Sequence, residues 1–156
     1  MKADPTAQTR HTQAVIDTNV LLSAALSPGG APARLVDRLL EIGKLVFSAA
    51  TFAEIETRIW LPKFDRYITL EQRKAFLNDL SSAALWVKVP PLVGARAYSR
   101  DADDDKFIHT ALAAQAVWLI TGDKDLLVLA ETMLPLGVRI ASPADAIASP
   151  AFLPLL

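Results

Sequence analysis

Short apolar segments alternate with segments of helical periodicity along this chain, and this alternation restricts the fold more than any other feature. Each apolar segment is only three to five residues long, as expected of a strand. The strands are predicted over residues 14–16, 44–47, 85–89, 117–120 and 137–141. Strands that are continuous apolar runs are typical of a parallel sheet buried on both faces. The pattern therefore predicts an α/β fold, a three-layer α/β/α sandwich around a central, mostly parallel five-stranded sheet.

The segments between these strands carry helix signals. Thr69 and Gln72 have the spacing of a capping box, and the helix that Thr69 opens is predicted to bury Leu70, together with Phe76, Leu77 and Leu80. Gly43 stands at the position of a helix C-cap. The remaining helices are expected on either side of the break at residues 28–30, then over 51–60, 103–116 and 126–129, and from Pro143 after an N-cap at Ser142.

Composition agrees with one globular domain. The 156 residues are 52% apolar, carry a net charge of −1 and include no Cys, which excludes disulfides and thiolate chemistry and fits a reducing cytoplasm. Near-neutrality argues against a broad basic surface for nucleic acid, but not against local phosphate binding. The apolar stretch 14–26 is shorter than the roughly 20 residues that span a bilayer. We expect a flexible leader over 1–13 without a signal peptide, one domain over 14–148, a C-terminal tail over 149–156, and no membrane association.

Acidic residues follow the predicted strands. Asp17 comes directly after the first strand, Glu54 lies in the helix after the second, residues 103–105 open the helix after the third, and Asp123 follows the fourth. Because the carboxyl ends of parallel strands share one edge of the sheet, these side chains should converge there. Converging carboxylates repel one another unless a cation intervenes, and Mg²⁺ or Mn²⁺ prefers such oxygen ligands. The expected chemistry is metal-assisted phosphodiester hydrolysis.

Each acid also has a structural explanation that needs no metal. Asp17 and Asp123 fit turn or N-cap positions just after a strand. Thr51 and Glu54 have the spacing of a capping box, in which the Glu54 carboxylate would accept a backbone N–H. The acids at 103–105 suit the positive end of a helix dipole. A single divalent-metal site accounts for all these positions together, so we favour it.

Four motifs carry a family resemblance. They are Asp17-Thr18-Asn19 after an apolar strand, Glu54 early in a helix, the run from Arg100 to Phe107 at a helix opening, and Thr121-Gly122-Asp123-Lys124-Asp125 after a strand. In this order and spacing they resemble the PIN domain, and more narrowly the PIN-domain toxins of bacterial toxin–antitoxin pairs, over residues 14–148. The resemblance implies a cytoplasmic endoribonuclease that uses one or two Mg²⁺ or Mn²⁺ ions to cleave single-stranded RNA, with a cognate antitoxin protein as partner.

The resemblance also assigns roles by position. The family's motif makes the catalytic and metal-binding quartet Asp17, Glu54, Asp105 and Asp123. Asp105 is taken in preference to Asp104 because the family's third acid stands three positions before an inward-facing apolar residue, here Ile108. Asp104 is then a supporting or alternative acid. Asn19 and Thr121 would be the polar residues that orient the metal ligands.

Basic side chains supply candidate substrate contacts. Lys106 and Lys124 flank the acids, where they would either hold the scissile phosphate or reduce the repulsion between carboxylates. Residues 58–74 hold five basic side chains against two acids, with aromatic residues between them, and Arg58 and Lys63 are candidate RNA ligands. The same segment also fits the core, or a surface on which an antitoxin or a second copy docks, and the apolar excess of the chain favours a homodimer.

Two other function classes compete with a ribonuclease. A phosphatase or phosphotransfer domain also places an Asp after its first strand, but such phosphatases usually carry a second Asp two residues later, where this chain has Asn19. A catalytically silent PIN-like module that binds RNA or protein would need no acidic quartet. The presence of all four acids favours the enzyme.

Overall fold

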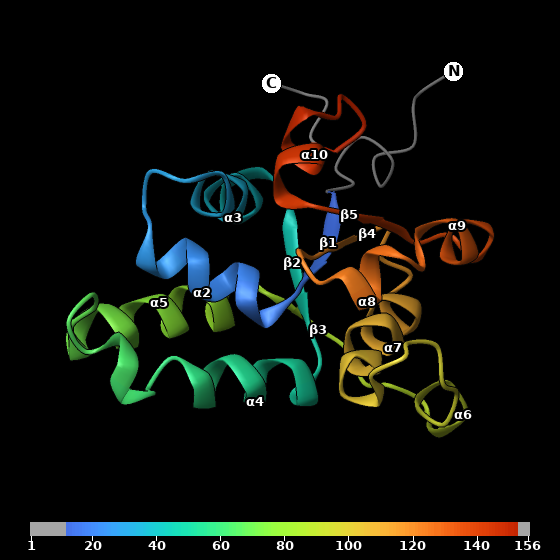
Figure 1. Cartoon of the computed structure of the whole chain (residues 1–156), viewed down its shortest axis with the longest axis horizontal. Coiled ribbons are helices and arrows are strands. Elements are labelled where there is room, and N and C mark those ends of the chain that lie inside the picture. The colour runs from blue at the N-terminus through green and yellow to red at the C-terminus, as the bar shows by residue number, and fades with distance from the viewer. Residues whose placement is uncertain (1–11, 153–156) are drawn as a thin grey trace, which may run out of the picture.

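The computed structural model describes residues 12–152, and they form one parallel sheet between two layers of helices (Figure 1). The strands are β1 (Gln13–Ile16), β2 (Lys44–Phe47), β3 (Leu85–Trp86), β4 (Trp118–Ile120) and β5 (Arg139–Ala141). Their order across the sheet is β3-β2-β1-β4-β5, and every pair is parallel. The predicted architecture is confirmed, with a sheet that is parallel throughout. The order reverses at β1, because the chain extends the sheet to one side through β2 and β3 and then crosses to β4.

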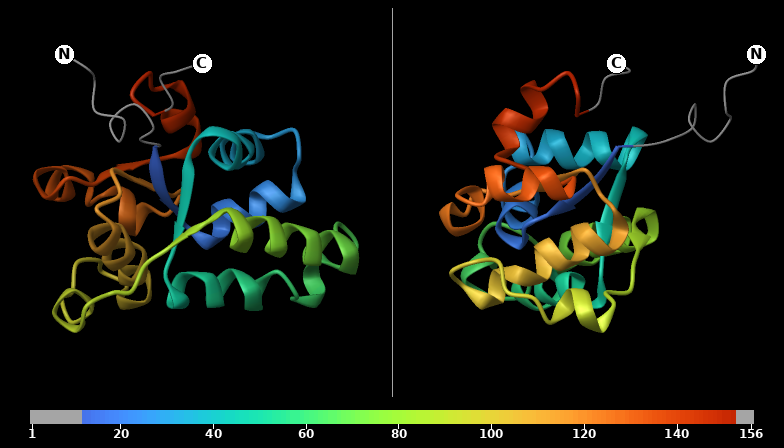
Figure 2. Two further views of the ribbon diagram at one scale, coloured as in Figure 1. Left: turned by 180° about the vertical axis from the view of Figure 1, so that it is seen from behind. Right: turned by 90° about the vertical axis from the view of Figure 1, so that its right-hand side faces the viewer.

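Helices cover both faces of the sheet, as the two views of Figure 2 show. On one face lie α2 (Thr18–Leu26), α3 (Ala31–Ile42), α4 (Ala49–Arg58), α5 (Leu70–Ala83) and α10 (Pro143–Ala148). On the other lie α7 (Asp105–Ala114), α8 (Lys124–Leu127) and α9 (Ala130–Met133). The remaining short elements are α6 (Pro91–Gly94) and the 3₁₀ helices η1 (Pro62–Phe64), η2 (Ala102–Asp104) and η3 (Leu134–Leu136).

Two-sided burial explains why the central strands are apolar at every position after the first residue of β1 and β2. Ile16 in β1 packs in the cluster formed with α2, α3, α4, α5 and α10. Its neighbour Val15 packs in the opposite cluster, with α7, α8 and α9. Both side chains are almost completely buried, since successive side chains of a strand point to opposite faces.

Several local predictions hold and others need correction. Thr69 and Gln72 do form a capping box. The box that opens α4, however, pairs Ser48 with Thr51, so Thr51 is not an N-cap and Glu54 has no capping role. Leu70 is exposed, which corrects the prediction that it is buried.

Two positions show packing that local patterns do not reveal. Gly43 is the C-cap of α3 but has an extended backbone, and a Cβ there would lie 2.8 Å from a Leu39 methyl and 3.0 Å from the Thr12 carbonyl oxygen. Glycine is therefore required by close approach of the chain and not by a left-handed turn. Beyond α10, Phe152 is buried against Trp118, so part of the predicted tail belongs to the core.

Strand β3 is shorter than predicted, because pairing with β2 covers only Leu85 and Trp86. The flexible leader predicted over 1–13 lies, up to residue 11, outside the described residues, as does the end of the tail from 153. Within the described part of the chain, no helix combines the length and apolar character needed to cross a membrane.

Candidate functional site

Asp17 is fixed at the point where β1 ends beside β4. Its backbone N–H donates to the Ile120 carbonyl at 2.9 Å, so the ends of the two strands are tied together. The Thr121 hydroxyl donates to Asp17 Oδ2 at 2.7 Å and accepts the backbone N–H of Asp123 at 2.9 Å. Thr121 therefore positions both acids, while Asp17 Oδ1 receives only a long 3.4 Å contact from the Asn19 backbone N–H.

Two further carboxylates, those of Asp104 and Asp125, converge on Asp123 beside this pair of strand ends. One oxygen from each of Asp104, Asp123 and Asp125 lies within 4.8 Å of the other two. Asp123 is the N-cap of α8 and accepts the backbone N–H of Asp125 at 2.8 Å through Oδ1. Asp104 ends η2, and its Oδ2 is a buried atom without a hydrogen-bond partner. The sequence pattern assigns no role in the site to Asp125, although it is the second Asp of the Thr121–Asp125 motif and stands two residues after Asp123.

Burial and repulsion between charges disturb the ionisation of Asp17 and Asp104. Burial raises the pKa of Asp17; hydrogen bonds from Thr121 and Asn19 oppose this effect, and the charges of Asp123 and Glu54 add to it. Desolvation, then the charges of Asp123 and Asp101, raise the pKa of Asp104 to about 7. Both carboxyl groups are therefore harder to ionise than an ordinary Asp, a cost that a bound cation relieves.

Asp105 is not part of this group. Its carboxylate, only 5% exposed, accepts backbone N–H groups from Ser99 at 2.7 Å and from Tyr98 at 3.3 Å. These contacts attach the loop before η2 to the start of α7. Of the two adjacent acids, Asp104 is therefore the one whose carboxylate lies close to Asp123 and Asp125, whereas that of the predicted Asp105 is directed to the loop.

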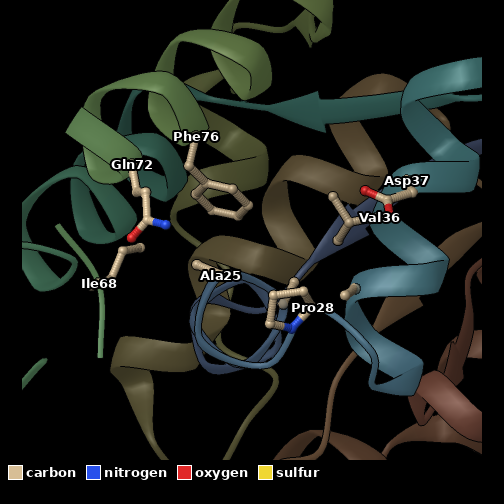
Figure 3. Close-up of a pocket in the computed structure, with 9 residues that line it drawn as sticks. Ala25, Pro28, Val36, Asp37, Ile68, Gln72 and Phe76 are labelled. Carbon is tan, nitrogen blue, oxygen red and sulfur yellow. The ribbon is translucent and has the colours of Figure 1, made fainter. Parts of the chain in front are cut away.

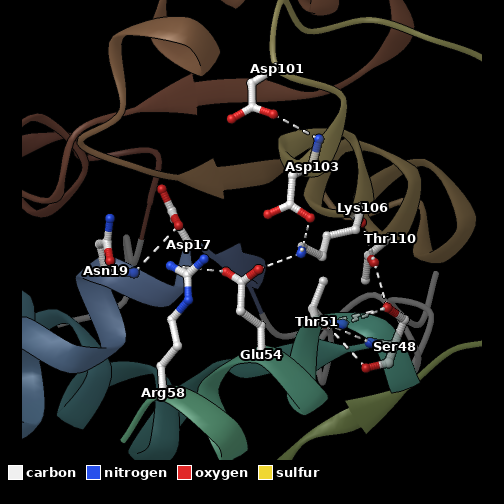
Figure 4. A network of polar contacts seen from close by, with 10 residues as sticks. All are labelled: Asp17, Asn19, Ser48, Thr51, Glu54, Arg58, Asp101, Asp103, Lys106 and Thr110. Atoms are coloured by element: carbon white, nitrogen blue, oxygen red, sulfur yellow. Dashed lines mark hydrogen bonds and ion pairs between the residues drawn. The ribbon is translucent and has the colours of Figure 1, made fainter. Parts of the chain in front are cut away.

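Two cations, Lys106 and Arg58, pair with Glu54 (Figure 4). Glu54 itself lies outside the three-carboxylate group. Lys106 donates to Glu54 Oε2 and also to Asp103 Oδ1, and Arg58 Nη1 lies 3.6 Å from Glu54 Oε1. Partial burial alone would lower the pKa of Lys106, but the hydrogen bonds that it donates to Glu54 and Asp103 outweigh this effect and raise the pKa. The predicted basic residues Lys106 and Arg58 thus stand beside the acids, held there by Glu54.

Buried hydroxyl groups hold α4 and α7 in the relative position that this network needs. Ser48 Oγ, at the N-terminus of α4, lies 2.8 Å from Thr110 Oγ1 on α7. Thr110 in turn donates to the Lys106 carbonyl at 2.7 Å. The Glu54 and Lys106 side chains therefore meet because their helices are attached one turn or more away from the ion pair.

A hollow of about 320 Å³ opens beside the acids and is lined in part by Asn19, Gly122 and Asp123. Lys124 is exposed next to it and, among the described residues, makes no ion pair. Lys63 lies on η1, outside the acidic group. A separate hollow between α2, α3 and α5 is lined mainly by apolar groups such as Ala25, Val36 and Phe76 (Figure 3), and it offers no cluster of acids.

The sequence that carries these acids after β1 and β4 also matches a known protein family over most of its length. A family model of the PIN domain matches residues 13–125. This chain belongs to the PIN-domain family. The uncharacterized protein MJ1680 of Methanocaldococcus jannaschii is 38% identical over 118 residues, which are 74% of this chain and 73% of that protein.

Solved structures share the fold of this PIN domain at low sequence identity. VapBC2 of Rickettsia felis, bound to a DNA fragment from its promoter, superposes with a TM-score of 0.53 at 12% identity, covering 83% of this chain and 98% of the other. FitAcB of Neisseria gonorrhoeae gives 0.52 at 20% identity, covering 84% and 98%. FitAB bound to the IR36 DNA fragment gives 0.56 at 21% identity, covering 83% and 94%.

The side chains of this PIN domain fit a divalent metal ion. The donor set consists of carboxylate oxygens, which hard cations prefer, and Asp104 Oδ2 is a buried acceptor for which the protein provides no donor. Asp17 adds a carboxylate whose orientation Thr121 fixes. Asp104, Asp123 and Asp125, with Asp17 beside them, are therefore the residues that would hold such an ion.

Proposed function

We propose that this PIN domain is a Mg²⁺- or Mn²⁺-dependent endoribonuclease that hydrolyses single-stranded RNA. The observation that carries the proposal is the group of Asp104, Asp123 and Asp125 beside Asp17, with one buried carboxylate oxygen left without a donor. We assign metal binding to Asp104 and Asp123, supported by Asp17 and Asp125. One or two bound ions would acidify a water molecule and neutralise charge that develops on the phosphate.

The protein's own groups supply the remaining requirements. The Thr121 hydroxyl donates a hydrogen bond to Asp17 Oδ2. Asp17 Oδ1, which receives only the long contact from the Asn19 N–H, is therefore the oxygen that binds a ligand or accepts a proton from the attacking water. Glu54 holds Lys106 and Arg58 beside the acids, where these cations can donate hydrogen bonds to the non-bridging oxygens of the scissile phosphate. Lys124, exposed next to Asp123, is a further phosphate ligand in this proposal.

We also propose that the enzyme acts as the toxin of a toxin–antitoxin pair, located in the cytoplasm and paired with an antitoxin protein. The structural similarity to VapBC2 and FitAB, whose names each denote a complex of two proteins, supports this proposal. Induced expression should arrest growth, and co-expression of a small protein encoded next to the gene should restore it. A homodimer remains part of the proposal and is measured by sedimentation of the purified protein.

The ribonuclease proposal is tested with labelled single-stranded RNA, duplex RNA and single-stranded DNA. The purified protein should cleave the first substrate with Mg²⁺ or Mn²⁺ and not in EDTA. Asp17→Asn should abolish cleavage without changing the thermal melting curve by more than a few degrees. Asp145→Asn, which alters an exposed acid on α10, is the matched control and should cleave normally. Cleavage in excess EDTA would refute the mechanism, and RNA binding without cleavage would favour a silent binding module.

A further inference from the structure

The segment between α4 and α5, residues 59–69, presents aromatic and basic side chains to solvent, and we call it the connector. Tyr67 is 64% exposed and Trp60 is 36% exposed. A guanidinium lies over each ring: that of Arg66 is 5.9 Å from the centre of the Tyr67 ring, and that of Arg73 is 5.6 Å from the centre of the Trp60 ring. Because Arg73 is buried, Arg66 is the cation that a ligand can reach beside an exposed ring, and this pair suits a ligand that combines flat rings with negative charge.

Buried side chains hold the backbone of the connector in place. Ile59 and Ile68, near its two ends, are both buried. Arg73, only 2% exposed, donates from Nη2 to Asp65 Oδ1 at 3.0 Å and so attaches the connector to α5. The exposed rings are therefore presented on a preformed surface, and a ligand that binds there has little backbone to order.

The connector and its flanks are locally basic in a chain of net charge −1. Asp65 is paired with Arg73. Among the residues that the structure describes, Lys63, Arg66 and Lys74 take part in no ion pair. A polyanion complements this charge, whereas an apolar protein surface would bury the cations without partners.

The connector follows α4, the helix that carries Glu54, whose charge acts on Asp17. Arg58, one turn beyond Glu54, is paired with it and immediately precedes the connector (Figure 4). Figure 1 shows the connector at the end of α4 that lies away from the sheet. At about 1.5 Å per residue, Glu54 lies about 6 Å along the helix from Arg58, the last residue of α4, so the connector begins about two stacked nucleotides beyond Glu54 at about 3.4 Å each.

We propose that the connector binds the unpaired nucleotides that flank the cleavage position of single-stranded RNA. A base stacks on Tyr67, and Lys63 and Arg66 pair with neighbouring phosphates. The inference rests on the proposed function for the identity of the substrate and adds the surface that selects unpaired over paired RNA. Bases in a duplex are stacked on each other, so their faces are closed to Tyr67.

Fluorescence anisotropy with a short labelled oligouridylate tests this surface. The measurements use the cleavage-deficient Asp17→Asn protein with Mg²⁺ present, so that binding is observed without hydrolysis. Tyr67→Ala should weaken binding roughly 5- to 100-fold, and Tyr67→Phe should retain it, because stacking needs the ring and not the hydroxyl. The double variant Lys63→Ala with Arg66→Ala should reduce the slope of log affinity against log salt by about 1.4. Lys88→Ala, an exposed lysine outside the connector, should change neither quantity.

The outcomes separate this inference from the proposed function. Unchanged RNA affinity in Tyr67→Ala and in the double variant would overturn the connector as an RNA surface, even if the wild-type protein cleaves RNA. Loss of affinity in these variants would support it, even if the wild-type protein does not cleave. If Tyr67→Ala converts a dimer into a monomer in sedimentation while RNA affinity stays the same, the connector is a contact between copies and the inference is wrong.

Discussion

Replacing Asp104 with Asn should stabilise the metal-free protein at pH 8 and remove its response to Mn²⁺. A carboxyl group whose folded-state pKa is raised stabilises the fold below its unfolded pKa of 3.8, and this stabilisation disappears as the pH rises through about 7. A shift of about three pKa units corresponds to a ceiling of about 4 kcal/mol. Solvent screening at this partly exposed side chain reduces the expected gain to about 1–2 kcal/mol. In a chain of this size that is an increase in Tm of roughly 2–8 °C.

The assay is thermal unfolding at pH 4 and pH 8, with EDTA or with Mn²⁺. Asp104→Asn should match the wild type at pH 4, exceed it at pH 8 in EDTA, and show no stabilisation by Mn²⁺. Asp105→Ala is the control for the neighbouring acid. It should lose about 1–3 kcal/mol at pH 8, because the Ser99 and Tyr98 N–H groups lose their acceptor, yet still be stabilised by Mn²⁺. Destabilisation of Asp104→Asn at pH 8, or an intact Mn²⁺ response, would refute the reasoning.

Two further substitutions test how the site is held. Thr121→Val removes the hydroxyl that joins Asp17 to Asp123, so we expect the Mn²⁺ affinity from calorimetry to fall about 10- to 100-fold; unchanged affinity would contradict the bridging role. Glu54→Gln weakens the charge that holds Lys106 and should raise KM for RNA in cleavage assays, with Mn²⁺ affinity within a few-fold of wild type. A complete loss of Mn²⁺ binding would instead make Glu54 a metal ligand.

The sheet and the edge at which the acids gather could be predicted from the sequence, because both depend on local signals. Apolar runs mark the strands whatever their partners, and the carboxyl end of each strand is fixed by chain direction. Asp17 follows β1 directly and Asp123 stands three residues after the end of β4, so their place in the fold follows from the strand pattern alone. The Thr69 capping box is local in the same way.

The remaining details depend on contacts between distant parts of the chain. Asp104 and Asp105 are adjacent in sequence, and the backbone donors of the Tyr98 loop determine which of them turns away from Asp123. Glu54 meets Lys106 across 52 positions, which no helix pattern reveals. Arg73 is buried because its guanidinium pairs with Asp65 and lies over the Trp60 ring, although a basic residue on a helix is ordinarily assigned to the surface.

Anomalous diffraction from crystals grown with Mn²⁺ tests the central claim most directly, since it locates the ion independently of any activity. The account predicts an anomalous peak in direct contact with the carboxylates of Asp104 and Asp123, and none in crystals of Asp104→Asn grown in the same way. A peak bound by Asp105, or Mn²⁺ density only at sites away from these two acids, would contradict it.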